Sequence, residues 1–228
     1  MRRLLITAGP TCEPIDGARF LGNRSSGRLG CCIAQQAAIK GHEATLLLGS
    51  TAKLPAAHPR LRVVRFRTAR ELAALLSEHW PSHDVLVMAA AVADCTVRGG
   101  ERKGKVRRDS LRILELSPTD DLVAMAAADS RSDQRIIAFA LEEPAELEAS
   151  ARHKLQAKHV DAIVANPMST MDAESIAAEI FCSDGRVFTP PGELSKPAFA
   201  AWLLEHLAEI LLPDPRDGTL CGFSATTC

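Results

Sequence analysis

The sequence contains no tyrosine, almost no net charge and no long apolar run. The formal net charge is −1 over 228 residues, so no strong basic field points to nucleic acid as a partner. No apolar run approaches the roughly 20 residues that would span a bilayer. The short apolar stretch near the start is broken by Gly9 and Pro10, which argues against a signal peptide. We therefore expect a cytoplasmic protein that binds neither nucleic acid nor a membrane.

The cysteines lack the spacing of a metal site or of a disulfide framework. Seven cysteines are scattered along the chain, and none belongs to a CxxC pair. An odd, irregularly spaced set argues against structural disulfides and against a zinc centre. Because no motif pairs a cysteine with a histidine, we interpret the thiols as small buried residues or surface groups rather than nucleophiles.

Apolar strand-like segments alternate with helix-like segments along most of the chain. Continuous apolar strands separated by helices are typical of a mainly parallel sheet, so we predict a Rossmann-like α/β fold with helices on both faces. The predicted strands are 3–9, 43–49, 84–94, 135–141 and 161–166, and the predicted helices are 29–41, 68–80, 117–130, 145–159 and 195–212.

Local signals refine this prediction. Thr68 is a predicted helix N-cap, and Gly41 is a predicted helix stop. Asp184 followed by Gly185, between the apolar runs of 177–190, predicts a β-hairpin.

Two segments interrupt the alternation. The Gly- and Arg/Lys-rich segment 95–110 is predicted to be a mobile basic loop, and 111–116 an extra, antiparallel strand outside the main sheet. No convincing linker divides the chain, so we expect one domain over 1–212. The patternless segment 213–228 is expected to be a loose tail.

The stretch "GNRSSGRLG", residues 22–30, holds small and polar residues just ahead of a predicted helix. A strand, a small-residue loop and a helix N-terminus form a common anion site, because free backbone N–H groups and the helix dipole face the ligand. Ser25 and Ser26 add hydroxyl groups, and Arg24 and Arg28 add charge. A loop of small residues without a ligand is the plainer alternative.

The connection between Gly9 and Gly27 is long compared with the usual two to six residues between a strand and a helix. Such loops at the carboxyl edge of a parallel sheet tend to be functional. This loop can bring Asn23 over the sheet edge, where its amide can donate to a carbonyl or an oxyanion.

The segments "LLITAGPT", "EPID", "RF" and "NRSSGRLG" resemble the opening of the phosphopantothenoylcysteine synthetase (phosphopantothenate–cysteine ligase) family. The resemblance continues through "GHEATLLLG", "AAAVAD", "FALEE", "KLQAKHVDAIVAN" and "SK", and covers about residues 3 to 211. The chain resembles the free-standing form of the synthetase. Because a flavin-dependent decarboxylase domain is not among the matching segments, we expect no flavin.

The resemblance implies a C–N bond-forming ligase of coenzyme A biosynthesis. CTP or ATP, with Mg²⁺, activates the carboxylate of 4′-phosphopantothenate as an acyl-nucleotide, and the amine of L-cysteine then displaces the nucleotide. The sequence departs from the family pattern at Cys12, Asp120 and Leu141, and the choice between CTP and ATP stays open. The family covers an exposed strand edge by dimerising, so a homodimer is expected.

The resemblance also implies the site residues. Asn23, Lys103 and Arg19 are the expected catalytic residues, Lys103 on a loop that closes over the triphosphate. The metal ligands are not identified. The expected nucleotide- and phosphate-binding residues are Gly9, Ser25, Ser26, Gly27, Ala91, Asp94, Asp121, Leu122, Val123, Phe139, Lys154 and Lys158.

Simpler interpretations of these residues remain open. Arg19 can anchor a loop by an ion pair, Lys103 can lie in a solvated loop, and Phe139 can be plain core. Lys154 and Lys158, at i and i+4 on one predicted helix face, can simply be solvated.

Two other functions are also open. One is a non-catalytic nucleotide-binding protein, and the other is a Rossmann-type NAD(P)-binding oxidoreductase. The oxidoreductase is disfavoured because GxGxxG is absent, no acidic residue ends the second strand, and there is no tyrosine for a Tyr/Lys pair.

Overall fold

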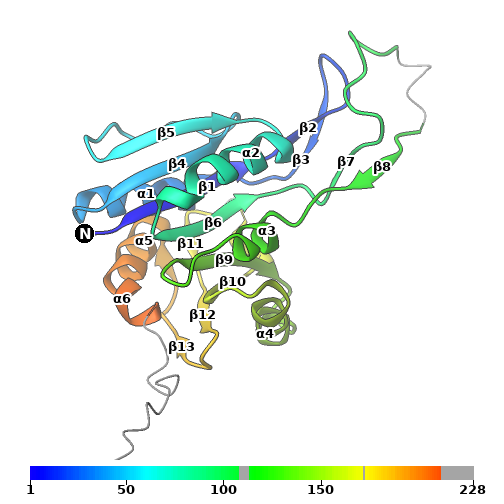
Figure 1. Ribbon diagram of the computed structural model, residues 1–228. Coiled ribbons are helices and arrows are strands. Elements are labelled where there is room, and N and C mark those ends of the chain that lie inside the picture. Colours follow the sequence, from blue (N-terminus) through cyan, green and yellow to red (C-terminus); the bar gives the residue numbers. More distant parts are fainter. Residues whose placement is uncertain (108–112, 172, 212–228) are drawn as a thin grey trace, which may run out of the picture.

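The computed structural model describes residues 1–107, 113–171 and 173–211. Its centre is an eight-stranded sheet with the order β13-β12-β10-β9-β6-β1-β4-β5 (Figure 1). Neighbouring strands from β10 to β5 are parallel, and β12 and β13 are antiparallel. The strands are β1 Arg3–Pro10, β4 Glu43–Gly49, β5 Leu61–Phe66, β6 Val85–Ala91, β9 Arg135–Glu142, β10 Ala162–Pro167, β12 Glu179–Cys182 and β13 Val187–Phe188.

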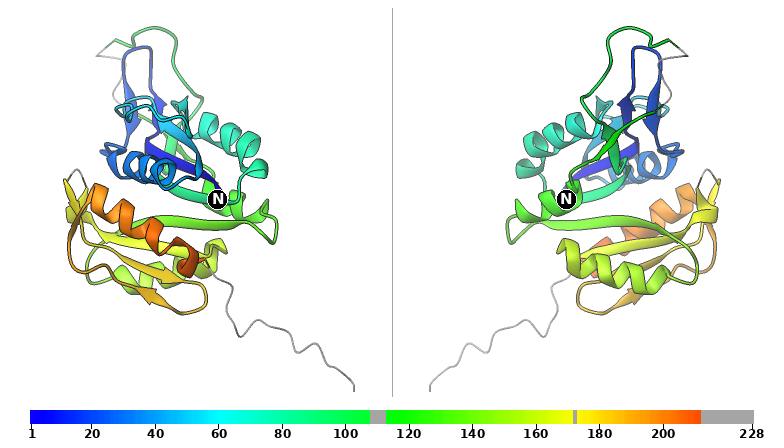
Figure 2. Two further views of the ribbon diagram at one scale, coloured as in Figure 1. Left: turned by 90° about the vertical axis from the view of Figure 1, so that its left-hand side faces the viewer. Right: turned by 90° about the vertical axis from the view of Figure 1, so that its right-hand side faces the viewer.

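Helices cover both faces of this sheet, as predicted (Figure 2). One face carries α1, α5 and α6, and the other carries α2, α3 and α4. The helices are α1 Arg28–Ile39, α2 Ala69–His79, α3 Leu122–Ala128, α4 Leu147–Lys158, α5 Lys196–Glu205 and α6 Leu207–Ile210, with short 3-10 turns η1 Trp80–Ser82 and η3 Met168–Thr170.

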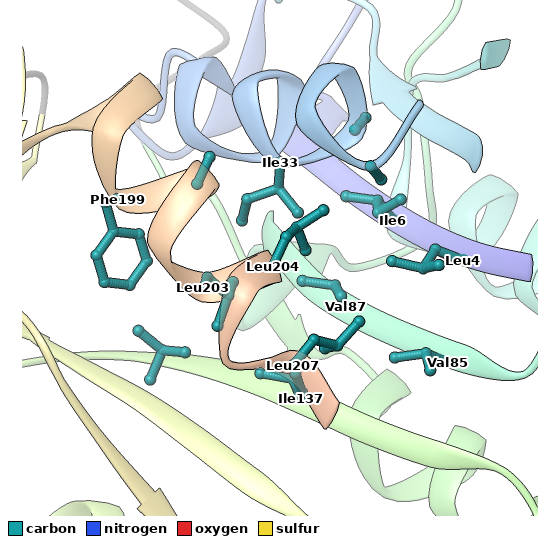
Figure 3. Packing of buried hydrophobic residues seen from close by; sticks show 14 of the residues in the cluster. Leu4, Ile6, Ile33, Val85, Val87, Ile137, Phe199, Leu203, Leu204 and Leu207 are labelled. Atoms are coloured by element: carbon teal, nitrogen blue, oxygen red, sulfur yellow. The ribbon is translucent and has the colours of Figure 1, made fainter. Parts of the chain in front are cut away.

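The two cores follow from the alternation of side chains along each strand. In β1, Leu4 and Ile6 pack against α1 and α5, whereas Leu5 packs on the opposite face. Figure 3 shows the first core, in which Ile33 of α1 and Leu204 of α5 meet over the strands. Because both faces are covered, the central strands β1, β4 and β6 are apolar along most of their length rather than alternating between polar and apolar residues.

Several predicted boundaries are confirmed. Thr68 caps α2 by accepting a hydrogen bond from the Glu71 backbone amide. Gly41, with φ of +88°, follows the end of α1. The predicted hairpin is the β12–β13 pair, and Gly185 has φ of +91° in its turn.

Other boundaries differ from the prediction. The strand predicted over 84–94 ends at Ala91, so Asp94 lies in the loop beyond it. The helix predicted over 117–130 begins only after Asp121, because Ser117 and Pro118 belong to a strand. The helix predicted over 195–212 is interrupted at His206, and residue 212 lies outside the described residues.

The extra antiparallel strand exists but is shifted along the chain. Strand β8, Leu116–Pro118, pairs with β7, Cys95–Val97. The predicted strand 111–116 therefore shares only Leu116 with β8, and residues 111–112 lie outside the described residues. Residues 213–228, the predicted tail, also lie outside them. Two further short strands, β11 Ser175–Ile176 and β14 Leu194–Ser195, pair beside α5.

The long connection after β1 contains a hairpin that the sequence analysis missed. Strands β2, Cys12–Pro14, and β3, Phe20–Gly22, pair antiparallel. Together with segment 98–107 this hairpin projects beyond the sheet, and we call the two segments (12–22 and 98–107) the arm (Figures 1 and 2). Within the described ranges, no helix has the length and apolarity to cross a bilayer.

The strand order defines where a ligand is expected. From β1 the chain passes through α1 to β4 on one side, and it later returns to β6 on the other side of β1. The carboxyl ends of β1 and β6 therefore flank the point at which the strand order reverses. In open α/β sheets, ligands bind in the crevice at this point.

Candidate functional site

A cavity of about 750 Å³ lies at the carboxyl edge of the sheet, beside the ends of β6, β9 and β10. It is bounded by the loop 22–30, the segment after β6, the start of α3 and one side of α4. Both helical faces of the fold contribute, because α1 lies on one side of the sheet and α3 and α4 on the other. The cavity is thus at the place that the topology predicts.

The loop "GNRSSGRLG" lines this cavity and leads into α1. Gly27 begins the helix in the left-handed region, with φ of 73°. A Cβ atom there would lie 2.9 Å from the backbone of Gly9 and 2.9 Å from the Ala52 side chain. Only glycine therefore lets the helix start this close to the end of β1. The helix N-terminus consequently faces the cavity without a capping side chain at Gly27.

Two serines shape the same loop. The Ser25 hydroxyl accepts a hydrogen bond from the Gly27 amide at 3.3 Å, and the Ser26 hydroxyl accepts one from the Arg28 amide at 3.4 Å. Both serines line the cavity. Long, weak bonds of this kind leave the hydroxyls able to turn toward an anion.

Threonines of the "TAGPT" segment fix the opposite wall. Thr7 and Thr11 are fully buried. Their hydroxyls accept hydrogen bonds from the amides of Ala90 at 3.0 Å and Ala93 at 2.9 Å. The segment after β6 is therefore held in place by side chains of β1 and of the residue that follows it.

Asn23 lies over the sheet edge, as predicted from the long connection. Its side-chain amide donates to the carbonyl of Val92 at 3.2 Å, and the residue is exposed on the cavity wall. A primary amide has two N–H groups. One is used by Val92, which leaves the other for a ligand oxygen.

Two lysines of α4 line the cavity on its other side. Lys158 Nζ lies 3.0 Å from Asp121 Oδ2, and Lys154 forms an ion pair with Glu142. Their shared orientation confirms the prediction that positions i and i+4 share a face. Each lysine is thus held in place by a carboxylate, and Asp121 itself lines the cavity.

The ion pairs lower the pKa values of the two carboxyl groups that take part in them. Burial raises the pKa of Asp121, but the Ala124 amide and the Lys158 ammonium outweigh it, so the pKa lies below its ordinary value. Burial also raises the pKa of Glu142, and hydrogen bonds from Lys154 and Ser150 likewise lower it below the ordinary value. Both carboxylates are therefore ionised at neutral pH, and an anionic ligand has to compete with them for the lysines.

Asp94 contributes a carboxylate from the loop after β6. It is exposed and lines the cavity. Its backbone carbonyl accepts from the Thr119 amide at 2.9 Å, which ties the loop to the start of α3. Asp121 caps α3 by accepting from the amides of Val123 and Ala124, each at 3.1 Å.

Most predicted site residues come together in this one cavity. Phe139 is half-buried and lines it, beside apolar core residues of the first cluster. The predicted residues among the lining are Asn23, Ser25, Ser26, Gly27, Ala91, Asp94, Asp121, Leu122, Val123, Phe139, Lys154 and Lys158.

Three predicted residues lie elsewhere. Gly9 sits behind Gly27 rather than in the lining, where close packing and φ of +82° account for the glycine. Arg19 and Lys103 lie on the arm, outside the lining residues. Arg19 forms an ion pair with Asp16, which is the loop-anchoring role left open above.

The cavity also contains residues that the sequence analysis missed. Asn166 is the last residue but one of β10, at the same sheet edge, and the rule that placed Asp94 could have identified it. Thr170 has no sequence signal, and Lys196 belongs to the matching segment "SK" without having been assigned to the site. Lys196 is only 6% exposed at the first turn of α5, and its place in the lining follows from the tertiary packing of α5 beside α1.

The buried thiols fit the structural interpretation given above. Burial raises the pKa of Cys31 and of Cys182 to about 11. Burial also raises the pKa of Cys12. Such thiols are protonated at neutral pH and are poor nucleophiles.

The end of β4 has no acidic residue that could bind the ribose hydroxyls of a dinucleotide. The strand ends at Gly49, and the next residues are Ser50 and Thr51. Arg65 donates to the carbonyls of Gly49 at 2.6 Å and Ala52 at 2.8 Å, so its guanidinium holds this turn together. The acidic group that a dinucleotide site requires is not at this position.

A protein-family model and several curated proteins are similar to this chain. The family model "DNA/pantothenate metabolism flavoprotein C-terminal domain" matches residues 1–211. The chain is 38% identical over 202 residues to the "Coenzyme A biosynthesis bifunctional protein CoaBC" of Mycobacterium tuberculosis strain H37Rv, with 84% of this chain and 47% of the relative covered. It is also 38% identical over 167 residues to a "Cysteine/Cysteine sulfinic acid decarboxylase" from an unknown prokaryotic organism, with 73% and 46% covered. The chain spans about half the length of these curated relatives.

Solved structures share the fold. The C-terminal domain of a CoaBC protein is 31% identical, with a TM-score of 0.75 and coverage of 92% of this chain and 95% of that one. A Cab2 mutant in complex with phosphopantothenate-cysteine has a TM-score of 0.75 at 17% identity, with 92% and 86% covered. The second likeness concerns the fold alone.

Proposed function

The chain belongs to the DNA/pantothenate metabolism flavoprotein C-terminal domain family, and on this basis we propose that it joins 4′-phosphopantothenate to L-cysteine in coenzyme A biosynthesis. A nucleoside triphosphate, CTP or ATP, activates the carboxylate as an acyl-nucleotide with loss of pyrophosphate. The cysteine amine then attacks the acyl carbon, which forms the amide and releases the nucleoside monophosphate.

One observation carries this proposal. A single cavity at the switch point combines a helix N-terminus, the amide of Asn23 and the ammonium groups of Lys154 and Lys158. The activation step brings together two anions, phosphopantothenate and the nucleoside triphosphate, and the reaction develops further negative charge at the phosphoryl and acyl oxygens. A site built from fixed donors and cations suits this chemistry, because it needs positioning and charge stabilisation more than proton transfer.

The walls suggest separate tasks for the residues. Ser25, Ser26 and the amides at the start of α1 would hold phosphate oxygens. Asn23 would donate its free N–H to the acyl oxygen when cysteine adds. Phe139 would pack against the base or sugar, while Lys154 and Lys158 exchange their carboxylate partners for phosphate oxygens.

The donor set also fits a Mg²⁺ ion brought by the nucleotide. Over the described ranges, no group of three or more His, Cys, Asp or Glu side chains is placed to hold a metal. Mg²⁺ commonly uses one or two carboxylates together with substrate phosphates, and Asp94 offers an exposed carboxylate on the cavity wall. Bound there, the ion would neutralise charge on the triphosphate. No residue in this scheme calls for a flavin.

We also propose that the chain acts as a homodimer. The arm projects from the sheet (Figure 1) and exposes Phe20, which is 52% accessible. Arg19 and Lys103 lie on this arm, away from the cavity of their own chain. A second copy would cover the apolar surface and could receive these cations at its cavity. The ligase unit would be 1–212, working in the cytoplasm.

Pyrophosphate release tests the proposal. The folded protein is mixed with phosphopantothenate and with CTP or ATP in turn, first without and then with cysteine. We expect pyrophosphate with at least one nucleotide, and light scattering should give the mass of a dimer. Release that needs no phosphopantothenate, or no release with either nucleotide, would rule out the ligase. A monomer at micromolar concentration would rule out the dimer.

A further inference from the structure

Asp16 joins the two segments of the arm. The residue is fully buried, between β2 and β3. Its Oδ1 atom accepts from the backbone amides of Ala18 and Arg19, each at 2.9 Å. Its Oδ2 atom accepts from Arg19 Nε at 3.1 Å and from the amide of Val106 at 3.0 Å. One carboxylate therefore holds its own turn, an arginine and a segment far away in the sequence.

Three further bonds connect the same two segments. Arg19 Nη2 donates to the carbonyl of Val106 at 2.8 Å. The Gly17 amide donates to the carbonyl of Gly104 at 2.9 Å, and the Arg102 amide donates to the carbonyl of Ile15 at 3.1 Å. Lys103 thus lies between two residues whose backbones are anchored to the hairpin.

Glycines permit this close approach. A Cβ on Gly17 would lie 3.3 Å from the Gly104 carbonyl oxygen, and Gly104 itself has φ of +69°. The first bonds of Asp16 form an ordinary Asx-type turn. The bond to Val106 goes beyond that turn, because the two residues are 90 positions apart.

A cation and backbone amides surround the Asp16 carboxylate. Arg19 forms an ion pair with it, and the anchored segment brings Arg102, Lys103 and Lys105 to the same arm. The guanidinium of Arg19 and the amide of Ala18 lower the pKa of Asp16 well below its ordinary value, so the group is ionised at neutral pH.

We propose that Asp16 is a positioning residue for Lys103 and Arg19: its carboxylate fixes the backbone beside Lys103 and the guanidinium of Arg19, so the arm presents both cations as one unit. The catalytic part of this inference rests on the proposed ligase function. The structural part, that Asp16 holds segment 102–106 to the hairpin, does not.

Limited trypsin digestion tests the structural part. Because a protease needs its target segment detached and extended, we expect trypsin to cut faster after Arg102, Lys103 and Lys105 when this segment leaves the hairpin. Asp16→Asn keeps an acceptor for the turn amides but places an NH₂ group where Val106 and Arg19 donate. We expect cleavage at these bonds to be about ten- to a hundredfold faster than in the parent.

A matched variant shows whether faster cleavage follows from the loss of any aspartate paired with an arginine, wherever it lies in the fold. Asp184 lies in the β12–β13 turn, away from the arm. Its carboxylate likewise accepts hydrogen bonds from a nearby arginine, from the backbone amide of Arg186 at 3.0 Å and from Arg186 Nε at 2.6 Å. Asp184→Asn should leave cleavage at 102–105 unchanged. Val106→Pro is the second variant, because it keeps Asp16 and removes only the amide that donates to it. For this variant the bonds after Arg102 and Lys103 are compared, because trypsin does not cut a Lys–Pro bond, and cleavage at both should be faster than in the parent.

A double-mutant comparison tests the catalytic part. If Asp16 acts through Lys103, Asp16→Asn should lower kcat/KM about tenfold to a hundredfold in the parent. It should lower it much less in a Lys103→Gln background. Equal losses in both backgrounds, or cleavage rates equal to the parent in both arm variants, would overturn the proposal. If the parent itself does not ligate, the proposed function fails, whereas the trypsin result still decides whether Asp16 holds the arm.

Discussion

Lys158 and Asp121 form an ion pair on the wall of the cavity, with Nζ 3.0 Å from Oδ2. The lysine comes from α4 and the aspartate from the N-cap of α3, so the pair joins the two helices that form one wall. Both side chains are partly exposed, 27% and 47% respectively. The pair is therefore accessible to an incoming phosphate, which can replace the carboxylate as the partner of Lys158.

This relationship predicts the effect of removing the ammonium. Lys158→Gln should weaken nucleotide binding about tenfold, because a hydrogen bond to a charged group contributes about 1.5–3 kcal/mol and part of that is already used by Asp121. Calorimetric titration with CTP and ATP measures the change. Lys40→Gln is the matched control, since Lys40 pairs with Glu205 at 3.1 Å on the surface, away from the cavity. Equal losses in both variants would remove Lys158 from the site.

The start of α1 predicts a difference between two glycine substitutions. Gly27→Ala should destabilise the fold by more than Gly185→Ala. Both residues have positive φ, which costs about 1–3 kcal/mol for a non-glycine residue. Only at Gly27 would the new Cβ also meet backbone atoms at 2.9 Å, whereas nothing lies within 4 Å at Gly185. Urea unfolding measures the two free energies, and equal values would contradict the close packing of α1 on β1.

A buried histidine predicts how stability depends on pH. His83 Nε2 lies 2.9 Å from Thr45 Oγ1, and Nδ1 lies 2.7 Å from the His79 carbonyl oxygen. Burial is the largest cause that lowers the pKa of His83 below 6.5. Because the folded state holds this proton less tightly than the unfolded state, the stabilisation is complete above about pH 6.5 and is lost as the pH falls toward the folded-state pKa.

His83→Gln cannot titrate, so it should flatten the fall in unfolding free energy between about pH 8 and about pH 5.5. Some slope should remain, because burial also lowers the pKa of His42. Urea unfolding at several pH values gives both slopes. A variant that loses stability evenly but keeps the slope of the parent would show that His83 is not the titrating group.

Asn23 and Lys103 are predicted to act in different half-reactions. Asn23→Asp places an acceptor where a donor is needed, so pyrophosphate should still form while acyl-nucleotide accumulates. Lys103→Gln removes a charge wanted by the triphosphate, so pyrophosphate release itself should slow. Each loss is expected to be about 10²–10³-fold in rate, as for other single electrostatic donors. Mass spectrometry of quenched reactions separates the two, and the opposite pattern would reverse the roles.

The sequence predicted those parts of the fold that depend on local periodicity. The buried strands, Thr68 as an N-cap and the turn at Gly185 all follow from residue patterns. Strand β5, "LRVVRF", was missed because Arg62 and Arg65, three residues apart, interrupt both a continuous apolar run and a strict alternation, at the edge of the sheet. The hairpin β2–β3 was missed because its pairing depends on contacts with segments after β6.

Part of the site could be predicted from one rule. The carboxyl ends of parallel strands, and the small-residue loops that follow them, meet at the same edge of the sheet. That rule places Asn23, Gly27 and Asp94 together, and the structure brings them to one cavity. It says nothing about Lys196, whose position depends on the packing of α5 against α1. It also could not foresee that backbone bonds to the hairpin hold Lys103 outside the lining.

The most direct test of the account is the identity of the product. The protein is incubated with phosphopantothenate, cysteine, Mg²⁺ and either CTP or ATP, and the mixture is examined by mass spectrometry. We expect one amide that contains both phosphopantothenate and cysteine, formed in equal amount to pyrophosphate and nucleoside monophosphate. Nucleotide hydrolysis without that amide, or an amide formed without nucleotide, would contradict it.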